Sequence, residues 1–110
     1  MSDLIRKHCV DCSPGTPALA PARVSELLAE LDGWSIDADG KHISRTYTFK
    51  NFHETMAFVN ALAWIAHRED HHPDLEVSYK TCRVRYNTHT VGGLSENDFI
   101  CAAKIDALLA

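Results

Sequence analysis

The chain has 110 residues, 45% of them hydrophobic and 24% charged, so it can bury one core and has little room for a second. This composition excludes a collagen-like, disordered or disulfide-scaffold protein. The formal net charge of −4 with histidine neutral argues against nucleic acid as a partner. Because the sequence shows neither a long apolar run nor a charged-then-apolar leader, we expect a cytoplasmic protein that contacts no membrane.

The first 20 residues differ from the rest of the chain. They are punctuated by proline and glycine and show little periodicity, so we expect residues 1–20 to form an arm that docks late or stays mobile. Residues 21–110 are expected to form a single domain. The four cysteines, expected to be free thiols in a reducing compartment, are Cys9, Cys12, Cys82 and Cys101.

The first helix and a hairpin follow the arm. Apolar residues at helical spacing predict a helix over about 21–32, with Gly33 available to end it. The dipeptide Asp39-Gly40 is typical of a tight hairpin turn between a short strand at 34–36 and an alternating strand at 43–49.

A longer helix and a second pair of strands are predicted next. Asn51 can cap a long helix over about 52–70, and Pro73 prevents the helix from continuing. Two more strands are predicted at 75–80 and 81–89, the latter with alternating apolar and polar residues.

The last helix begins after a glycine pair. Ser95 and Asp98 resemble a capping box, which predicts a helix from there to the C-terminus. The order α-β-β-α-β-β-α predicts an α+β two-layer sandwich, in which a four-stranded antiparallel sheet carries its helices on one face.

Histidines provide the strongest chemical signal. The segment 67–73 reads His-Arg-Glu-Asp-His-His-Pro, and His67 and His71 would share one face if the helix extends that far. His89 precedes the pair Gly92-Gly93, where backbone can approach a ligand closely. A pocket joining these segments would bring together imidazoles suited to proton transfer, although a solvated helix end rich in histidine is an equally good interpretation.

Other chemistries have weaker support. Histidines four apart with a carboxylate could hold zinc or iron, but the adjacent pair His71-His72 would point about 100° apart on a helix and would seldom reach one ion. Cys82 and Cys101 fall in apolar patterns that predict buried, inert thiols. No phosphate-binding glycine motif occurs in the sequence.

Several segments together resemble one known family. His71-His72-Pro73, His89 and the run Gly92-Gly93-Leu94-Ser95-Glu96-Asn97-Asp98 are similar to the pterin-4a-carbinolamine dehydratases, also called 4a-hydroxytetrahydrobiopterin dehydratases. The resemblance covers about residues 22–110 and includes the pair Gly33-Trp34. The Cys-x-x-Cys arm resembles an extension found in some bacterial members linked to phenylalanine hydroxylase.

The resemblance implies a hydro-lyase that removes water from 4a-hydroxytetrahydrobiopterin and gives quinonoid dihydropterin, in the recycling of tetrahydrobiopterin for aromatic amino acid hydroxylation. It implies no metal and no organic cofactor. The partners it implies are the pterin substrate, a functional link to phenylalanine hydroxylase, and other copies of the chain. The assembly would be a homodimer or homotetramer, with the last helix as a contact surface.

The resemblance also implies residue roles. The catalytic residues would be His71, His72 and His89, and the substrate-binding residues would be Trp34, Asp70, Asn87, Thr88, Thr90 and Asp98. His71 and His89 would act as acid and base in an order left open, while His72 would orient the pterin or hold its leaving hydroxyl. Trp34 would pack against the ring, and Asp98, whose simpler role is a helix cap, could fix an imidazole tautomer.

One position departs from the family pattern, because many relatives carry glutamate where this chain has His67. Three other functions remain as alternatives to the enzyme. They are a dimerisation cofactor for a homeodomain transcription factor, a pterin-handling protein of molybdenum-cofactor metabolism, and a histidine-rich metal protein.

Overall fold

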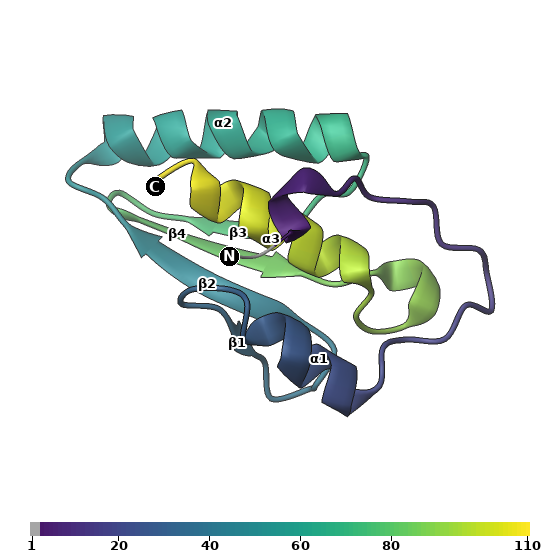
Figure 1. Ribbon diagram of the computed structural model, residues 1–110. Coiled ribbons are helices and arrows are strands. Elements are labelled where there is room, and N and C mark those ends of the chain that lie inside the picture. The colour runs from purple at the N-terminus through teal and green to yellow at the C-terminus, as the bar shows by residue number, and fades with distance from the viewer. Residues whose placement is uncertain (1–2) are drawn as a thin grey trace.

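A computed structural model describes residues 3–110 (Figure 1). In chain order the elements are the 3-10 turn η1 (Leu4–Arg6), helix α1 (Pro21–Leu28), strands β1 (Ser35–Ile36) and β2 (Ile43–Thr48), helix α2 (Phe52–Glu69), strands β3 (Asp74–Val77) and β4 (Thr81–Tyr86), the 3-10 turn η2 (His89–Val91) and helix α3 (Glu96–Ala107). Apart from the two 3-10 turns, this is the predicted order of helices and strands.

The four strands form one antiparallel sheet in the order β1-β2-β4-β3. In the central pair, Ile43 lies opposite Tyr86 and Tyr47 opposite Cys82, so both strands turn the same apolar face inward. These four side chains are at most 3% exposed. The alternation seen in the sequence therefore sets the register, since a slip of one residue would turn the apolar set to solvent.

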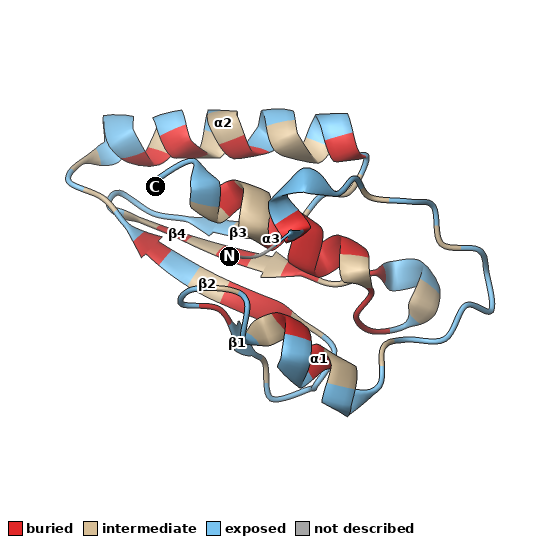
Figure 2. Ribbon diagram, viewed as in Figure 1, coloured by how far each residue is buried: buried red, intermediate tan, exposed pale blue. Residues whose placement is uncertain are grey.

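The helices cover this apolar face. Figure 1 shows α3 lying beside α2, and Figure 2 shows buried residues along α3 and an exposed outer side on α2. Tyr47 of β2 packs against Phe58 of α2 with ring centroids 4.6 Å apart. The predicted α+β sandwich with helices on one face is confirmed.

Local capping fixes the two longer helices. The Asn51 side chain accepts the backbone N–H of Glu54 at 2.9 Å, and Ser95 and Asp98 form the predicted capping box of α3. Element ends differ from the prediction elsewhere. α1 ends at Leu28 rather than near residue 32, and β4 ends at Tyr86, so the strand predicted over 81–89 is three residues too long.

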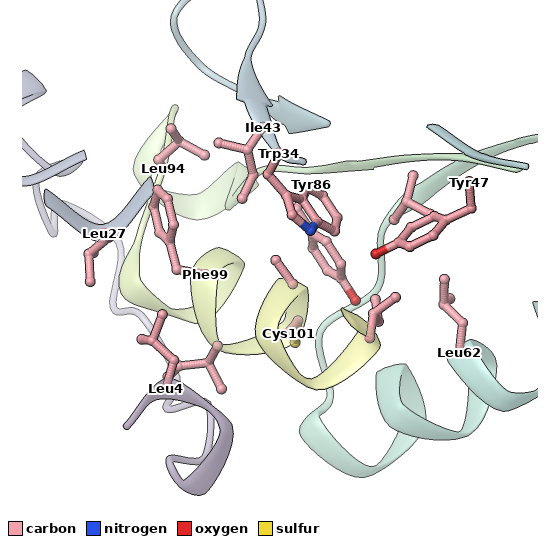
Figure 3. Packing of buried hydrophobic residues seen from close by; sticks show 14 of the residues in the cluster. Leu4, Leu27, Trp34, Ile43, Tyr47, Leu62, Tyr86, Leu94, Phe99 and Cys101 are labelled. Carbon is pink, nitrogen blue, oxygen red and sulfur yellow. The ribbon is translucent and has the colours of Figure 1, made fainter. Parts of the chain in front are cut away.

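The N-terminal arm is docked in this structure. Leu4 is 2% exposed and belongs to the core that includes Phe99 and Cys101 of α3 (Figure 3). Lys104 of α3 donates a hydrogen bond to the carbonyl of Ile5 at 2.8 Å. Of the two expectations for the arm, docked or mobile, the structure has the docked one. The domain boundary at residue 21 stays a prediction.

Three further features of the fold concern α3, the apolar character of the helices and the cysteines. The last helix, expected to be a contact surface between subunits, is mostly interior in the single chain, whereas Trp64 on α2 is 61% exposed. Within residues 3–110, none of the helices has the length and apolar character needed to cross a membrane. All four cysteines are free thiols in this structure.

Candidate functional site

One wall of the site is formed where α2 ends. The helix stops at Glu69, and Asp70 adopts a left-handed conformation with φ of 51° that turns the chain. The backbone N–H of His71 then bonds to the carbonyl of Ala66 at 3.1 Å, which ties the turn to the last helical residues. His71 therefore lies beyond the helix, and the shared helical face expected for His67 and His71 does not exist.

The opposite wall follows β4. Asn87 and Thr88 continue from the strand, and the chain then coils into η2, which carries His89. The backbone N–H of Thr88 donates to the carbonyl of Gly93 at 2.8 Å, closing the loop at its base. His89 was expected on a strand, but it lies on this 3-10 turn because the strand pairing has already ended at Tyr86.

These two walls enclose a cavity of about 210 Å³. Its lining residues are Asp70, His71, His72, Asp74, Asn87, Thr88, His89 and Thr90. Seven of these were predicted from the sequence as site residues, and Asp74 was not. The three imidazoles thus come from two separate stretches of the chain to one polar cavity.

Larger hollows differ from this cavity in their lining, although His72 borders one of them. One of about 320 Å³ beside Phe58 and Leu108 and one of about 370 Å³ beside Leu62 and Leu75 are lined mainly by apolar side chains. Ligand chemistry needs convergent polar groups as well as space. The smaller cavity has three histidines and two aspartates, so it is the better candidate site.

His71 is bound to a buried carboxylate. Its Nε2 lies 2.6 Å from Oδ1 of Asp98, whose side chain is 0% exposed. The other oxygen of Asp98 accepts the backbone N–H of Ser95 and the hydroxyl of Thr88, each at 2.9 Å. Asp98 therefore serves both as part of the helix cap and as the partner of an imidazole, the two roles that the sequence allowed together.

This environment changes the protonation of His71. Burial by itself favours the neutral ring, but the hydrogen bond and the negative charge of Asp98 outweigh it and raise the pKa of His71. Asp70 adds a smaller contribution in the same direction. His71 therefore keeps a larger protonated fraction near neutral pH than a free histidine does.

The orientation of the His71 ring is restricted from a second side. The ring stacks on Tyr86 with centroids 5.2 Å apart and planes 21° apart. The Tyr86 hydroxyl also donates to the main-chain carbonyl of His71 at 3.3 Å. By contrast, His72 and His89 are exposed side chains in the cavity lining.

Two predicted substrate-binding residues are not in the cavity lining. Trp34 is 6% exposed within the core, and its Nε1 donates to Oδ1 of Asp106 at 3.0 Å. Its indole is therefore not placed to pack against a ligand in the cavity. Asp98 lies behind His71 and acts on the cavity through that ring and through Thr88.

His67 lies outside the cavity on α2, where its ring is 5.3 Å from that of Trp64. The sequence analysis missed Asp74 and Tyr86 as site residues. Asp74 directly follows the His-His-Pro segment, and this position could have indicated a site residue. The alternating pattern predicted Tyr86 only as a core residue. Among residues 3–110, no group of three histidine, cysteine, aspartate or glutamate side chains is arranged to hold a metal ion.

The two-layer fold and the histidine-lined cavity define a small protein whose site is suited to proton transfer on a compact polar ligand. The chain belongs to the pterin 4 alpha carbinolamine dehydratase family, whose model matches residues 17–108. The resemblance drawn from the sequence is thereby confirmed.

Relatives of nearly equal length support this assignment. Proteins provisionally named pterin-4-alpha-carbinolamine dehydratase are 58% identical in Nitrosomonas europaea and 57% identical in Stenotrophomonas maltophilia. The alignments cover 96% and 98% of this chain and 93% and 96% of those proteins. Family membership supports a lyase that acts on a pterin.

Solved structures show the same fold. A structure described as a transcriptional coactivator/pterin dehydratase from Brucella melitensis matches with a TM-score of 0.81 and 31% identity, over 84% of this chain and 99% of that one. A pterin dehydratase-like RuBisCO assembly factor of the alpha-carboxysome matches with a TM-score of 0.61 and 22% identity, over 69% of this chain and 88% of that one. The second likeness concerns the fold alone.

Proposed function

We propose that this chain dehydrates 4a-hydroxytetrahydrobiopterin to quinonoid dihydropterin by histidine general acid–base catalysis. The observation that carries the proposal is the meeting of His71, His72 and His89 in one cavity, with His71 held by the buried Asp98. Family membership supplies the substrate class, and the cavity supplies groups of the required kind.

The reaction has two proton requirements. The hydroxyl on C4a leaves as water once it accepts a proton, and the N5 proton must depart as the C4a=N5 double bond forms. The electron pair of the N5–H bond becomes the new π bond, and the C–O pair leaves with the water. A protonated imidazole and a neutral one on different sides of the ligand meet both requirements.

We assign the acid to His71 and the base to His89. The raised pKa of His71 favours its protonated form near neutral pH, and its ring is fixed by Asp98 and Tyr86. His89 lies on the opposite wall, where it is exposed in the cavity lining. After release of the product, exchange with water restores both protonation states.

The remaining lining residues would bind the pterin. Asp70 and Asp74 provide carboxylate acceptors, which suit the amino and ring N–H groups of a pterin. Asn87, Thr88 and Thr90 offer further polar contacts on the other wall, and His72 would orient the ring. A cavity of about 210 Å³ suits a compact bicyclic ligand better than a nucleotide.

The proposal includes the physiological setting. The enzyme would recycle the pterin released by an aromatic amino acid hydroxylase such as phenylalanine hydroxylase. We also propose a homo-oligomer, a dimer or a tetramer, because Phe52 and Trp64 on α2 are 45% and 61% exposed in the single chain. Light scattering after gel filtration measures the subunit number directly.

The decisive experiment follows the ultraviolet decay of carbinolamine generated by phenylalanine hydroxylase. The purified chain should accelerate this decay, and His71→Ala and His89→Ala should each slow turnover about 10²-fold or more. His53→Ala is the matched control, since His53 is an exposed histidine of α2 outside the cavity lining and its replacement should leave turnover unchanged.

Circular dichroism of each variant shows whether the fold is retained. An unaccelerated decay with the wild-type chain would reject the dehydratase. Normal turnover in folded His71→Ala or His89→Ala would instead reject the residue assignment while leaving the activity in place.

A further inference from the structure

We propose that Cys9 and Cys101 form a reversible disulfide that fastens the N-terminal arm to α3. The two sulfur atoms lie 3.5 Å apart although the residues are 92 positions apart in the sequence. Cys9 belongs to the Cys-x-x-Cys motif of the arm, for which the dehydratase chemistry has no use. Neither the proposed reaction nor its residues are needed for this inference.

Hydrogen bonds hold the arm in place at Cys9 and at the residue after it. The backbone N–H of Cys9 donates to Oε1 of Glu69 at 2.7 Å. At the next residue, Val10 and Asn97 form a reciprocal pair, in which the Val10 N–H donates to Oδ1 at 3.1 Å and Nδ2 donates to the Val10 carbonyl at 2.7 Å. Because these hydrogen bonds already hold the two thiols close together, forming the disulfide costs little further conformational entropy.

Only a short movement separates the present contact from a covalent bond. A disulfide requires the sulfur atoms at about 2.05 Å, which side-chain rotation can approach when the backbones are already positioned. Cys101 is fully buried on α3, and Figure 3 shows it in the core near Tyr86. Cys9 is half-buried and forms the side of the pair that reaches solvent.

The surroundings also change the pKa values of the two thiols. The hydrogen bond from Cys9 and, more weakly, the positive charge of His71 lower the pKa of Cys101 against the opposing effect of burial. The pKa of Cys9 is raised, because its proton is held by the neighbouring sulfur and its thiol is partly buried. The pair thus shares a proton, and either sulfur can be the donor.

The other two cysteines are less well placed. Cys12 has its sulfur 3.8 Å from Nδ2 of Asn97, and Cys82 is buried in β4. Among the contacts of residues 3–110, the approach of Cys9 to Cys101 is the closest between thiols. The geometry therefore favours a bridge across the fold over a bridge within the Cys-x-x-Cys motif.

Hydrogen peroxide is a sufficient oxidant. One sulfur of the pair, as the thiolate, attacks one peroxide oxygen, the O–O bond breaks, and the released hydroxide takes up the proton of the other thiol as water. The second sulfur then attacks the sulfenic acid on the first, the S–O bond breaks, and the departing hydroxide takes a proton from solvent as the second water. Two thiols and one peroxide thus give one disulfide and two waters, and a dithiol reductant reverses the change.

The bond would lie directly behind the candidate site. The Cys101 thiol is 4.0 Å from the carbonyl of His71, the same carbonyl that Tyr86 contacts. Oxidation would remove this weak donor and fix the arm against α3. We expect the oxidised protein to be more resistant to heat, because the bridge closes a long loop and restricts the unfolded chain.

The test treats the reduced full-length chain with stoichiometric hydrogen peroxide and counts thiols in denaturant. The number of free thiols should fall by two from the four cysteines of the sequence. Trypsin should then release peptide 8–23 covalently joined to peptide 86–104, and dithiothreitol should separate the two. The temperature of unfolding should rise by about 5 °C or more in the oxidised protein.

The cysteine variants provide the controls. Cys9→Ser should abolish the joined peptides, and it is the main variant because Cys101 lies in the core. Cys12→Ser and Cys82→Ser should still form them. A bridge inside peptide 8–23, a dimer linked between chains, unchanged thiol counts, a sulfinic acid as the main product, or a lower unfolding temperature after oxidation would each overturn the proposal.

Discussion

Asp98 places Oδ1 2.6 Å from Nε2 of His71 while its Oδ2 accepts the N–H of Ser95, so one buried carboxylate joins the first turn of α3 to the cavity. Asp98→Asn keeps the shape but removes the charge that raises the pKa of His71. We expect this pKa to fall, and turnover to drop about 10- to 100-fold. NMR titration of the His71 ring protons and the pH dependence of kcat measure the two effects.

Ser95→Ala separates this electrostatic role from capping. It removes a side-chain acceptor from the helix terminus at a cost of about 1 kcal/mol but leaves the Asp98 charge in place. The pKa of His71 should therefore remain raised in Ser95→Ala. An unchanged His71 pKa in Asp98→Asn would contradict the electrostatic account of this site.

The same pair gives the unfolding free energy a pH dependence. The pKa of His71 is raised above 6.5 in the folded state, so protonated His71 stabilises the fold fully below that pH. This stabilisation is lost as the pH rises through the folded-state pKa. We expect the difference in unfolding free energy between wild type and His71→Gln to be larger near pH 6 than near pH 9 in urea titrations. A difference that grows with pH would have the wrong sign.

Glu69 has the opposite dependence and acts on the arm. Burial alone would raise its pKa, but the Cys9 N–H, His8 and Lys104 together lower it below 4.5. Its stabilising effect is therefore present above about pH 4.5 and is lost as the pH falls through the lowered value. At neutral pH, Glu69→Gln should loosen the arm in the same way that low pH loosens it in the wild-type protein. Faster hydrogen exchange at Cys9 and Val10, with little change at Cys82, is the expected observation.

The sequence predicted those parts of the fold that local chemistry determines. The alternation in β4, the Asn51 cap and the Ser95–Asp98 box depend on residues close together in the chain, and the structure confirms them. The end of α2 was predicted less well, because the left-handed residue there is Asp70 rather than a glycine. This turn moves His71 off the helix and toward Asp98.

The place of Trp34 could not be predicted for a different reason. Its partner Asp106 is 72 residues away, and a lone tryptophan after a glycine is equally consistent with a ligand contact or with the core. The cavity itself was anticipated from its histidines because the family resemblance joined segments that periodicity alone leaves unconnected. The docked arm had no signal of comparable strength, since Leu4 stands outside any periodic run.

Asp106 offers a test of stability independent of the cavity. Its Oδ1 accepts hydrogen bonds from Trp34 at 3.0 Å, Arg45 at 2.9 Å and Tyr47 at 2.5 Å. Asp106→Ala would leave these donors without their acceptor, and we expect a loss of about 2–4 kcal/mol in unfolding free energy. Urea unfolding followed by tryptophan fluorescence measures it. Asp106→Asn, which keeps an acceptor oxygen, should cost less, and an Asp106→Ala cost below about 0.5 kcal/mol would contradict this role.

Gly92 links backbone strain to the position of His89. It closes η2 with φ of 68°, and an added Cβ there would meet no atom within 4 Å, so Gly92→Ala introduces strain without a clash. We expect a cost of about 1 kcal/mol and a raised KM for carbinolamine, because the strained turn displaces His89. Gly40→Ala is the matched control, since Gly40 has φ of 69° and equally open surroundings but lies far along the chain in the β1–β2 hairpin. Gly40→Ala should lower the unfolding free energy by a similar amount and leave KM normal. An equal change of KM in both variants would show that general destabilisation, and not the turn, controls the cavity.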